Sequence, residues 1–199
     1  AFEEIGYKDA YKVEMLPEDA DPLDVRYNVI QWVHRSTRGW RYGASVTDPR
    51  TGEIIKGHVS LGSLRIRQDF MIAQGLMNKP FAERDDNHDK LMELALARIR
   101  QLSAHEVGHT LGFTHNFAAS TNEKASVMDY PHPQVEIENN EITFNEAYTV
   151  GLGPWDLHTV KYSYADVPDN ISEKQFLTKV LNDARDRGLQ FISDYDARA

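Results

Sequence analysis

The order of hydrophobic and polar residues changes along the chain, and its first part predicts β-strands. Val25–Val33 is rich in β-branched and aromatic residues, and it follows the polar turn segment Pro17–Asp24. This composition favours a strand, although a short apolar run of this kind also fits a helix.

A second pair of strands is expected on either side of a turn. Trp40–Val46 is the first strand candidate, and Ile54–Leu61 reads as the returning one. Between them, residues 48–52 combine a proline that fixes φ with a glycine suited to positive φ. Residues 40–61 therefore predict a hairpin, in which Gly57 marks a bulge or a close backbone approach.

A helical period then takes over and ends at Gly112. Apolar residues recur at helical spacing at Leu91, Leu94, Ala95, Ile99, Leu102 and Val107. Asp86 or Asn87 is the expected N-cap. The acidic cluster of residues 85–89 is most simply the solvated start of this helix, favoured there by the helix dipole, with a calcium site as the alternative.

Turn-forming residues dominate from 114 to 154, and two further helices are expected after them. These are Trp155–Tyr164 and Ser172–Arg187, the second ending at Gly188.

Composition narrows the possible functions. The chain has 199 residues, 41% hydrophobic, which suffices for one domain or a bilobed one. Its net charge of -9 argues against a nucleic acid or an anionic membrane surface as the main partner. The absence of cysteine excludes disulfides, a thiol nucleophile and thiolate zinc ligands. No stretch approaches the roughly 18 apolar residues that span a bilayer.

The segment QLSAHEVGHTLGFTHN, residues 101–116, carries the chemistry. His105 and His109 are four apart on a helix, so their side chains lie about 40° apart around its axis and can reach one ion. Glu106 lies on the flank of the same face, where its carboxylate can touch a metal-bound water. This arrangement predicts a zinc hydrolase.

His115 completes a three-nitrogen ligand set only if the helix stops. In a continuing helix it would lie about 120° around from His109 and about 9 Å further along. Gly112 can adopt the left-handed conformation that ends a helix and turns the chain back. Three neutral histidines with one open coordination position are typical of a catalytic zinc site. The remaining histidines are expected to be surface or core residues: His34, His58, His88, His132 and His158.

The segment His105–His115 resembles the long zinc-binding consensus of the metzincin metallopeptidases. Thirteen residues after His115, Met128 lies in the sequence SVMDYP, which resembles the metzincin Met-turn. In that clan the methionine forms an apolar floor beneath the zinc site, and the residues after 153 resemble the helix that packs below it.

This resemblance implies an α+β fold with a twisted mixed sheet, a long active-site helix above the cleft, and a mostly irregular or helical lower part. Residues 1–199 would form a single catalytic domain, with an upper subdomain 1–112 and a lower subdomain 113–199. Similarity of the tract Trp32–Gly62 to large bacterial metzincin-like proteases further implies a segment cut from a longer chain with flanking domains, located outside the cytoplasm. Asn116 departs from several familiar branches.

The expected activity is a zinc-dependent endopeptidase. Glu106 would be the general base and acid on a zinc-activated water, and Tyr130, by resemblance to the astacin-like and serralysin-like branches, would stabilise the oxyanion. Ile54–Leu61 is expected to be the edge strand that binds an extended peptide, with specificity set by the loop 116–150. A zinc hydrolase of non-protein amides and a non-catalytic, zinc-clamped interaction module are the alternatives.

Overall fold

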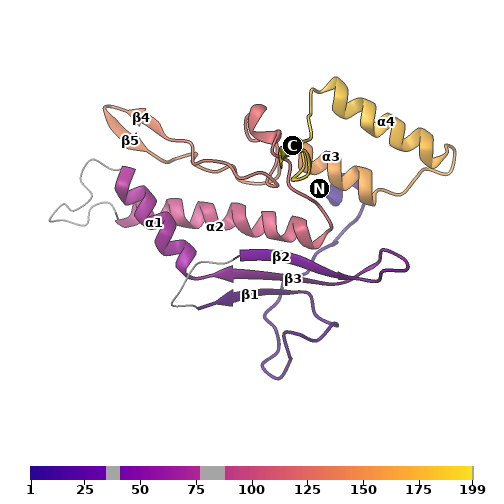
Figure 1. The fold of residues 1–199 in the computed structure, drawn as a ribbon, viewed down its shortest axis with the longest axis horizontal. Helices are drawn as coiled ribbons and strands as arrows, with labels where there is room; N and C mark the ends of the chain where they lie inside the picture. The colour runs from indigo at the N-terminus through magenta and orange to yellow at the C-terminus, as the bar shows by residue number, and fades with distance from the viewer. Residues whose placement is uncertain (35–40, 77–87, 199) are drawn as a thin grey trace. The chain divides into compact units, whose positions relative to one another are not determined.

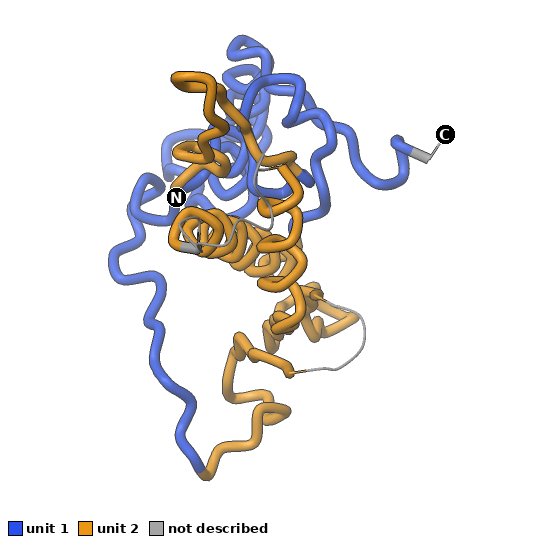
Figure 2. The backbone as a smooth tube through the Cα atoms, turned by 90° about the vertical axis from the view of Figure 1, so that its left-hand side faces the viewer, with its two compact units in different colours: residues 1–18, 113–130, 151–199 blue, residues 19–112, 131–150 orange. Residues whose placement is uncertain are grey.

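The computed structural model of the chain describes residues 1–34, 41–76 and 88–198. These residues group into two compact units, each built from separate stretches of sequence (Figure 2). Unit 1 comprises residues 1–18, 113–130 and 151–199, and unit 2 comprises residues 19–112 and 131–150. The expectation of a single catalytic domain with subdomains 1–112 and 113–199 stays a prediction.

Unit 2 is built on a three-stranded mixed sheet (Figure 1). Its strands are β1 (Val29–Val33), β2 (Arg41–Thr47) and β3 (Ile54–Gly62), in the order β1-β3-β2. The predicted hairpin is confirmed, because β2 pairs antiparallel with β3. The strand predicted at 25–33 is confirmed for its second half, and it runs parallel to β3.

The structure corrects the prediction that Ile54–Leu61 is the edge of the sheet. On one side, His58 is in register with Val29, and on the other side with Ala44. β3 is therefore the central strand, and its backbone hydrogen bonds are already used by both neighbours. The sequence did not show this because the parallel partner, β1, lies about two dozen residues earlier and its pairing is not set by a local turn.

Two glycines let helix α2 (His88–Thr110) lie directly on the sheet. A Cβ on Gly57 would be 2.9 Å from the Cβ of Thr110, and a Cβ on Gly43 would be 2.0 Å from the carbonyl oxygen of Glu106. Of the two predictions for Gly57, the close backbone approach is therefore confirmed. The register shift of the hairpin lies elsewhere, between Val46 and Thr47.

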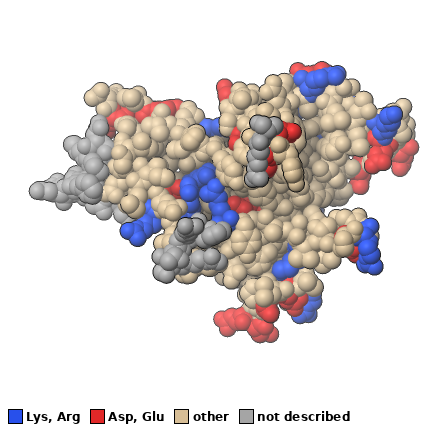
Figure 3. Space-filling view, in the orientation of Figure 1, with Lys and Arg blue, Asp and Glu red and all other residues tan. Residues whose placement is uncertain are grey.

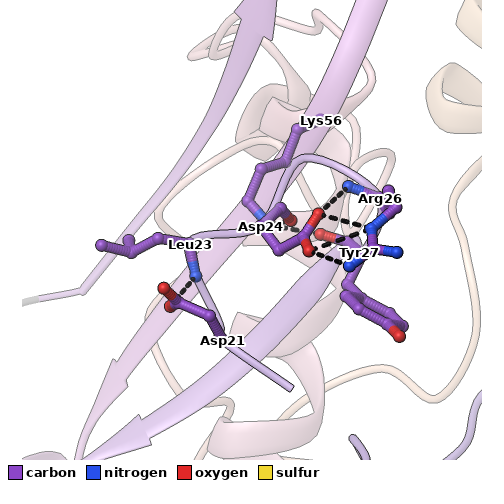
Figure 4. Close-up of polar contacts among 6 residues, drawn as sticks. All are labelled: Asp21, Leu23, Asp24, Arg26, Tyr27 and Lys56. Carbon is purple, nitrogen blue, oxygen red and sulfur yellow. Dashed lines mark hydrogen bonds and ion pairs between the residues drawn. The ribbon is translucent and has the colours of Figure 1, made fainter.

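The segment that leads into β1 is tied to β3 by a buried lysine (Figure 4). The ammonium of Lys56 donates to the carbonyl oxygens of Asp24, at 3.0 Å, and Tyr27. Arg26 forms an ion pair with the Asp24 side chain and lowers the pKa of that carboxyl to about 2. Main-chain carbonyls thus satisfy a charge that would be costly to bury alone.

Helix α1 (Leu64–Leu76) was not predicted from the sequence. Its core-facing positions include a carboxylate, Asp69, which is buried and paired with Arg65 at 2.7 Å. A carboxylate at a buried position interrupts the apolar period by which a helix is recognised in a sequence.

The long helix predicted up to Gly112 is confirmed as α2, which has 23 residues. Its expected N-caps, Asp86 and Asn87, and residues 85–87 of the acidic cluster lie outside the described residues. Two apolar clusters hold α2 in unit 2: one of Ala73, Leu91, Leu94 and Ala147, and one of Val59, Leu61 and Leu102.

Part of the expected loop between 114 and 154 forms a hairpin in unit 2. β4 (Glu136–Glu138) and β5 (Glu141–Thr143) pair antiparallel. Asn139 and Asn140 between them have φ values of 51° and 66°. Two consecutive positive φ angles suit a tight hairpin turn, and asparagine tolerates them better than most residues.

Unit 1 consists mainly of two helices and irregular chain. Helices α3 (Pro154–Tyr164) and α4 (Glu173–Asp186) confirm the two predicted there. Ser172 caps α4, and Gly188 follows it with a φ of 70°. Three short 3₁₀ turns complete the described elements: η1 (Glu3–Ile5), η2 (Ala119–Thr121) and η3 (Asp196–Arg198).

The mixed sheet and the helices together confirm the predicted α+β class. Basic and acidic side chains occur close together at several places on the face drawn in Figure 3. Arg50 forms an ion pair with Asp48 at 2.7 Å, and because the Arg50 side chain is largely exposed, solvent screens this interaction. Within the described ranges, no helix combines the length and the apolar character needed to cross a membrane.

Candidate metal centre

Helix α2 presents two histidines on one face near its C-terminal end. Nε2 of His105 lies 3.1 Å from Nε2 of His109, and the two rings meet edge to face with centroids 4.7 Å apart. His105 is 2% exposed. The i and i+4 spacing thus brings the two nitrogens to one point, as expected from the sequence.

Glu106, the next residue of α2, is 3% exposed. Its Oε1 lies 3.6 Å from Nε of Arg41, the first residue of β2. Gly43 of the same strand packs against the Glu106 main chain. Arg41 could not be predicted from the sequence, because its contact with Glu106 depends on how α2 lies on β2.

The helix ends as the motif predicts. α2 stops at Thr110, and Gly112 follows with a φ of 89°. The Gly112 N–H donates to the carbonyl of His109 at 3.0 Å, which closes the last turn. The left-handed residue redirects the chain before His115.

His115, in unit 1, has a polar partner at each ring nitrogen. Its Nδ1 lies 2.7 Å from Oδ2 of Asp194, and its Nε2 lies 2.7 Å from the hydroxyl of Tyr130. The His115 and Tyr130 rings are 4.7 Å apart. The structure therefore places the proposed oxyanion stabiliser directly beside the third predicted ligand.

His105, His109 and His115 form a group that could hold a metal ion, with one nitrogen from each and all three within 4.8 Å of one another. Of the other described histidine side chains, His34 and His132 are exposed, His58 is partly buried and His158 is buried. The side chain of His88 lies outside the described residues.

Asn116, the residue after the third histidine, is hydrogen-bonded to two other segments of unit 1. It is fully buried, and its N–H donates to the carbonyl of Met128 at 3.0 Å. Its side-chain amide donates to the carbonyl of Gln190 at 2.9 Å and accepts from the N–H groups of Ala118 and Ile192, each at 3.1 Å. The departure noted in the sequence is thus a structural anchor that joins the Met128 turn and the C-terminal segment.

The turn around Met128 is held by two buried carboxylates. Asp156 of α3 accepts hydrogen bonds from the Ser126 hydroxyl at 2.6 Å, the Val127 N–H at 3.0 Å and the Gly153 N–H at 2.7 Å. Burial raises the pKa of Asp156, against the lowering effect of these donors. Asp129 accepts from the N–H of Tyr130 at 2.7 Å and from Ser120.

Neither Asp194 nor the anchoring role of Asp156 was predicted from the sequence. Asp194 is separated from His115 by 79 residues, and Asp156 from Ser126 by 30. Neither distance leaves a periodic signal. An Asp at the third position of α3, after Gly-Pro, fits a capping residue and was the one local sign available.

Comparison with known proteins gives one family. Residues 87–199 match the Met-zincin family. This stretch covers more than half of the chain, and it includes Met128 and the three candidate ligands His105, His109 and His115. No curated protein and no solved structure matches the chain.

Proposed function

The chain belongs to the Met-zincin family, and from this premise we propose that it is a zinc-dependent endopeptidase. The observation that carries the proposal is the group of three histidines with a glutamate next to the first of them on the same helix. In the proposal His105, His109 and His115 are the ligands.

The donor set suits zinc. Two nitrogens that each lie about 2.1 Å from a tetrahedral zinc are about 3.4 Å apart. The 3.1 Å between the Nε2 atoms of His105 and His109 is close to that value. Three neutral nitrogens and no thiolate leave one coordination position open, which is typical of catalytic rather than structural zinc.

A bound zinc ion would supply an acidified water and polarise the scissile carbonyl. Glu106 takes the proton of the attacking water as general base and later delivers it to the leaving amine nitrogen. The low exposure of Glu106 and its contact with Arg41 hold the carboxylate in one orientation.

Tyr130 has a different task in the proposed mechanism. The residue is 43% exposed, and its hydroxyl lies 2.7 Å from Nε2 of His115. From there it can turn toward the carbonyl oxygen of a substrate and donate a hydrogen bond to the charge that develops on it.

We place an extended peptide substrate along β2 instead of β3. β2 is at the end of the strand order, and its residues Arg41 and Gly43 contact Glu106. A peptide added to an edge strand beside the general base would present its backbone to the reacting groups. Flanking domains and a location outside the cytoplasm stay predictions of the resemblance.

The test is to measure bound zinc and cleavage of a broad peptide library for the parent and for Glu106→Gln. Glu106→Gln should retain zinc and lose about 10²- to 10⁴-fold in the cleavage rate. Glu93→Gln, an exposed change of the same kind on the same helix, is the matched control and should cleave like the parent.

Two outcomes would contradict the proposal in different ways. Full zinc occupancy without any cleavage by the parent favours the non-catalytic module or a non-peptide amide substrate. Equal cleavage by the parent and Glu106→Gln removes Glu106 from the mechanism.

A further inference from the structure

A carboxylate from the C-terminal segment lies against the third predicted ligand. Oδ2 of Asp194 is 2.7 Å from Nδ1 of His115, at a separation of 79 residues. We propose that Asp194 is a positioning residue, which sets the tautomer and the ring orientation of His115 so that Nε2 faces the metal. The inference rests on the proposed zinc site and deepens it.

The chemistry of the two ring nitrogens supports this assignment. An ionised carboxylate can only accept a hydrogen bond, so Nδ1 of His115 must carry the proton that is donated to Asp194. In the neutral ring, Nε2 then carries the free lone pair. The Tyr130 hydroxyl, 2.7 Å from Nε2, donates to that lone pair. A metal-binding imidazole needs the same tautomer, because the ligand nitrogen must be unprotonated.

Asp194 is held in place by the backbone around it and does not lie on a loose tail. The N–H of Phe117 donates to the carbonyl of Ile192 at 2.9 Å, and the N–H of Ile192 donates to the Asn116 side chain at 3.1 Å. Beyond Asp194, Asp196 accepts from the N–H of Ser193 at 3.1 Å and from its hydroxyl at 2.8 Å. The backbone before and after Asp194 is thus held by hydrogen bonds.

The exposure of the pair separates a positioning role from a stabilising one. The Asp194 side chain is 36% exposed. Ion pairs with that degree of solvent access contribute little to folding. Loss of Asp194 should therefore change metal affinity more clearly than it changes stability.

The first experiment measures zinc affinity by competition with a chromophoric chelator. Asp194→Asn and Asp194→Ala should each weaken zinc binding by about 10- to 100-fold, with a thermal midpoint close to that of the parent. Asp186→Asn is the matched control, because it removes the same charge from an exposed position of unit 1 at the end of α4. Its zinc affinity should stay well within about tenfold of the parent. Equal affinity of parent and Asp194→Ala, or equal losses in Asp194→Asn and Asp186→Asn, would overturn the proposal.

The second experiment needs no metal and no activity. Long-range proton–nitrogen correlation spectra of the metal-free protein report the tautomer of His115, whose signals are assigned from a His115→Gln variant. The parent should show the form protonated at Nδ1, and Asp194→Ala should show a shift toward the form protonated at Nε2. The same tautomer in both proteins would overturn the proposal even if zinc affinity changed.

The two measurements also separate this inference from the proposed function. A parent that binds zinc and cleaves no peptide contradicts the endopeptidase and leaves Asp194 as a positioning residue. A parent that binds no zinc contradicts both.

Discussion

The two units hold their predicted site residues by different means. In unit 2, His105 and Glu106 are neighbours on one helix and His109 lies about one turn further along it, and this helix packs on a sheet through a close glycine contact. In unit 1, His115 and Tyr130 lie on irregular chain. That chain is held by the side chains of Asn116, Asp129 and Asp156, each of which bonds main-chain N–H groups of its neighbours.

The two units are therefore sensitive to different kinds of substitution. A helix positions its side chains through backbone geometry, so its weak point is whatever stops the helix from lying on the sheet. A loop is positioned through a few buried polar groups, and each of these is costly to lose because its partners remain buried without it.

Gly43→Ala should have the largest effect, and it tests unit 2. The added Cβ would lie 2.0 Å from the carbonyl oxygen of Glu106, which belongs to a helix backbone and cannot rotate away. We expect a loss of about 3 kcal/mol or more in the free energy of unfolding, measured with urea.

Gly75→Ala is the control for this change. Gly75 lies in α1, and no atom of the described residues lies within 4 Å of its added Cβ. This substitution should stabilise the protein by about 0.5–1 kcal/mol. Equal stability of parent and Gly43→Ala would contradict the close approach of β2 and α2.

Asn116→Ala tests the polar anchoring of unit 1. It leaves the Gln190 carbonyl and the N–H groups of Ala118 and Ile192 without this partner. The expected cost is about 3 kcal/mol, together with weaker zinc binding because His115 is the preceding residue. Asn182→Ala, on the exposed face of α4, should stay within about 0.5 kcal/mol of the parent. A stable Asn116→Ala would mean that the loop is held by something other than its amide.

Tyr130→Phe compares the contribution of unit 1 to the reaction with that of Glu106 in unit 2. It should lower kcat by about 10²-fold, less than the largest loss expected for Glu106→Gln, with zinc content unchanged. Tyr162→Phe on α3 serves as the control for loss of a hydroxyl. Unchanged kcat in Tyr130→Phe would leave the hydroxyl as a packing group of the loop.

The smallest effect concerns pH and His158 of α3. Burial, followed by nearby Arg187, lowers the pKa of His158 below its ordinary 6.5. The folded protein then binds fewer protons than the unfolded chain just below that value, so this contribution to stability is complete above about pH 6.5 and declines as the pH falls. His158→Gln should lessen the drop in thermal midpoint between about pH 7.5 and about pH 5. An identical drop in both proteins would contradict the burial of a neutral imidazole.

Local signals in the sequence were sufficient for α2, α3, α4 and the β2–β3 hairpin. Each rests on a short-range feature: a helical period, a Gly188 stop or a turn at residues 48–52. The same holds for the end of α2, because a glycine at position 112 is the local means of reversing the chain.

α1 was not predicted because its buried Asp69 interrupts the apolar period. Other features depend on distant contacts, and these were missed or wrong. β3 was assigned to the edge because its parallel partner is remote in sequence. Asp194 gave no signal for the same reason.

From the sequence alone, the residue types of the candidate ligands, their spacing and the turn at Gly112 could be predicted. These features depend only on helical geometry and on the glycine that ends the helix, so they are set by residues close together in the sequence. Only the tertiary structure decided which strand is central, which arginine contacts Glu106 and which carboxylate meets His115. Those choices follow from packing and hydrogen bonding between segments far apart in the chain, and no short-range pattern records them.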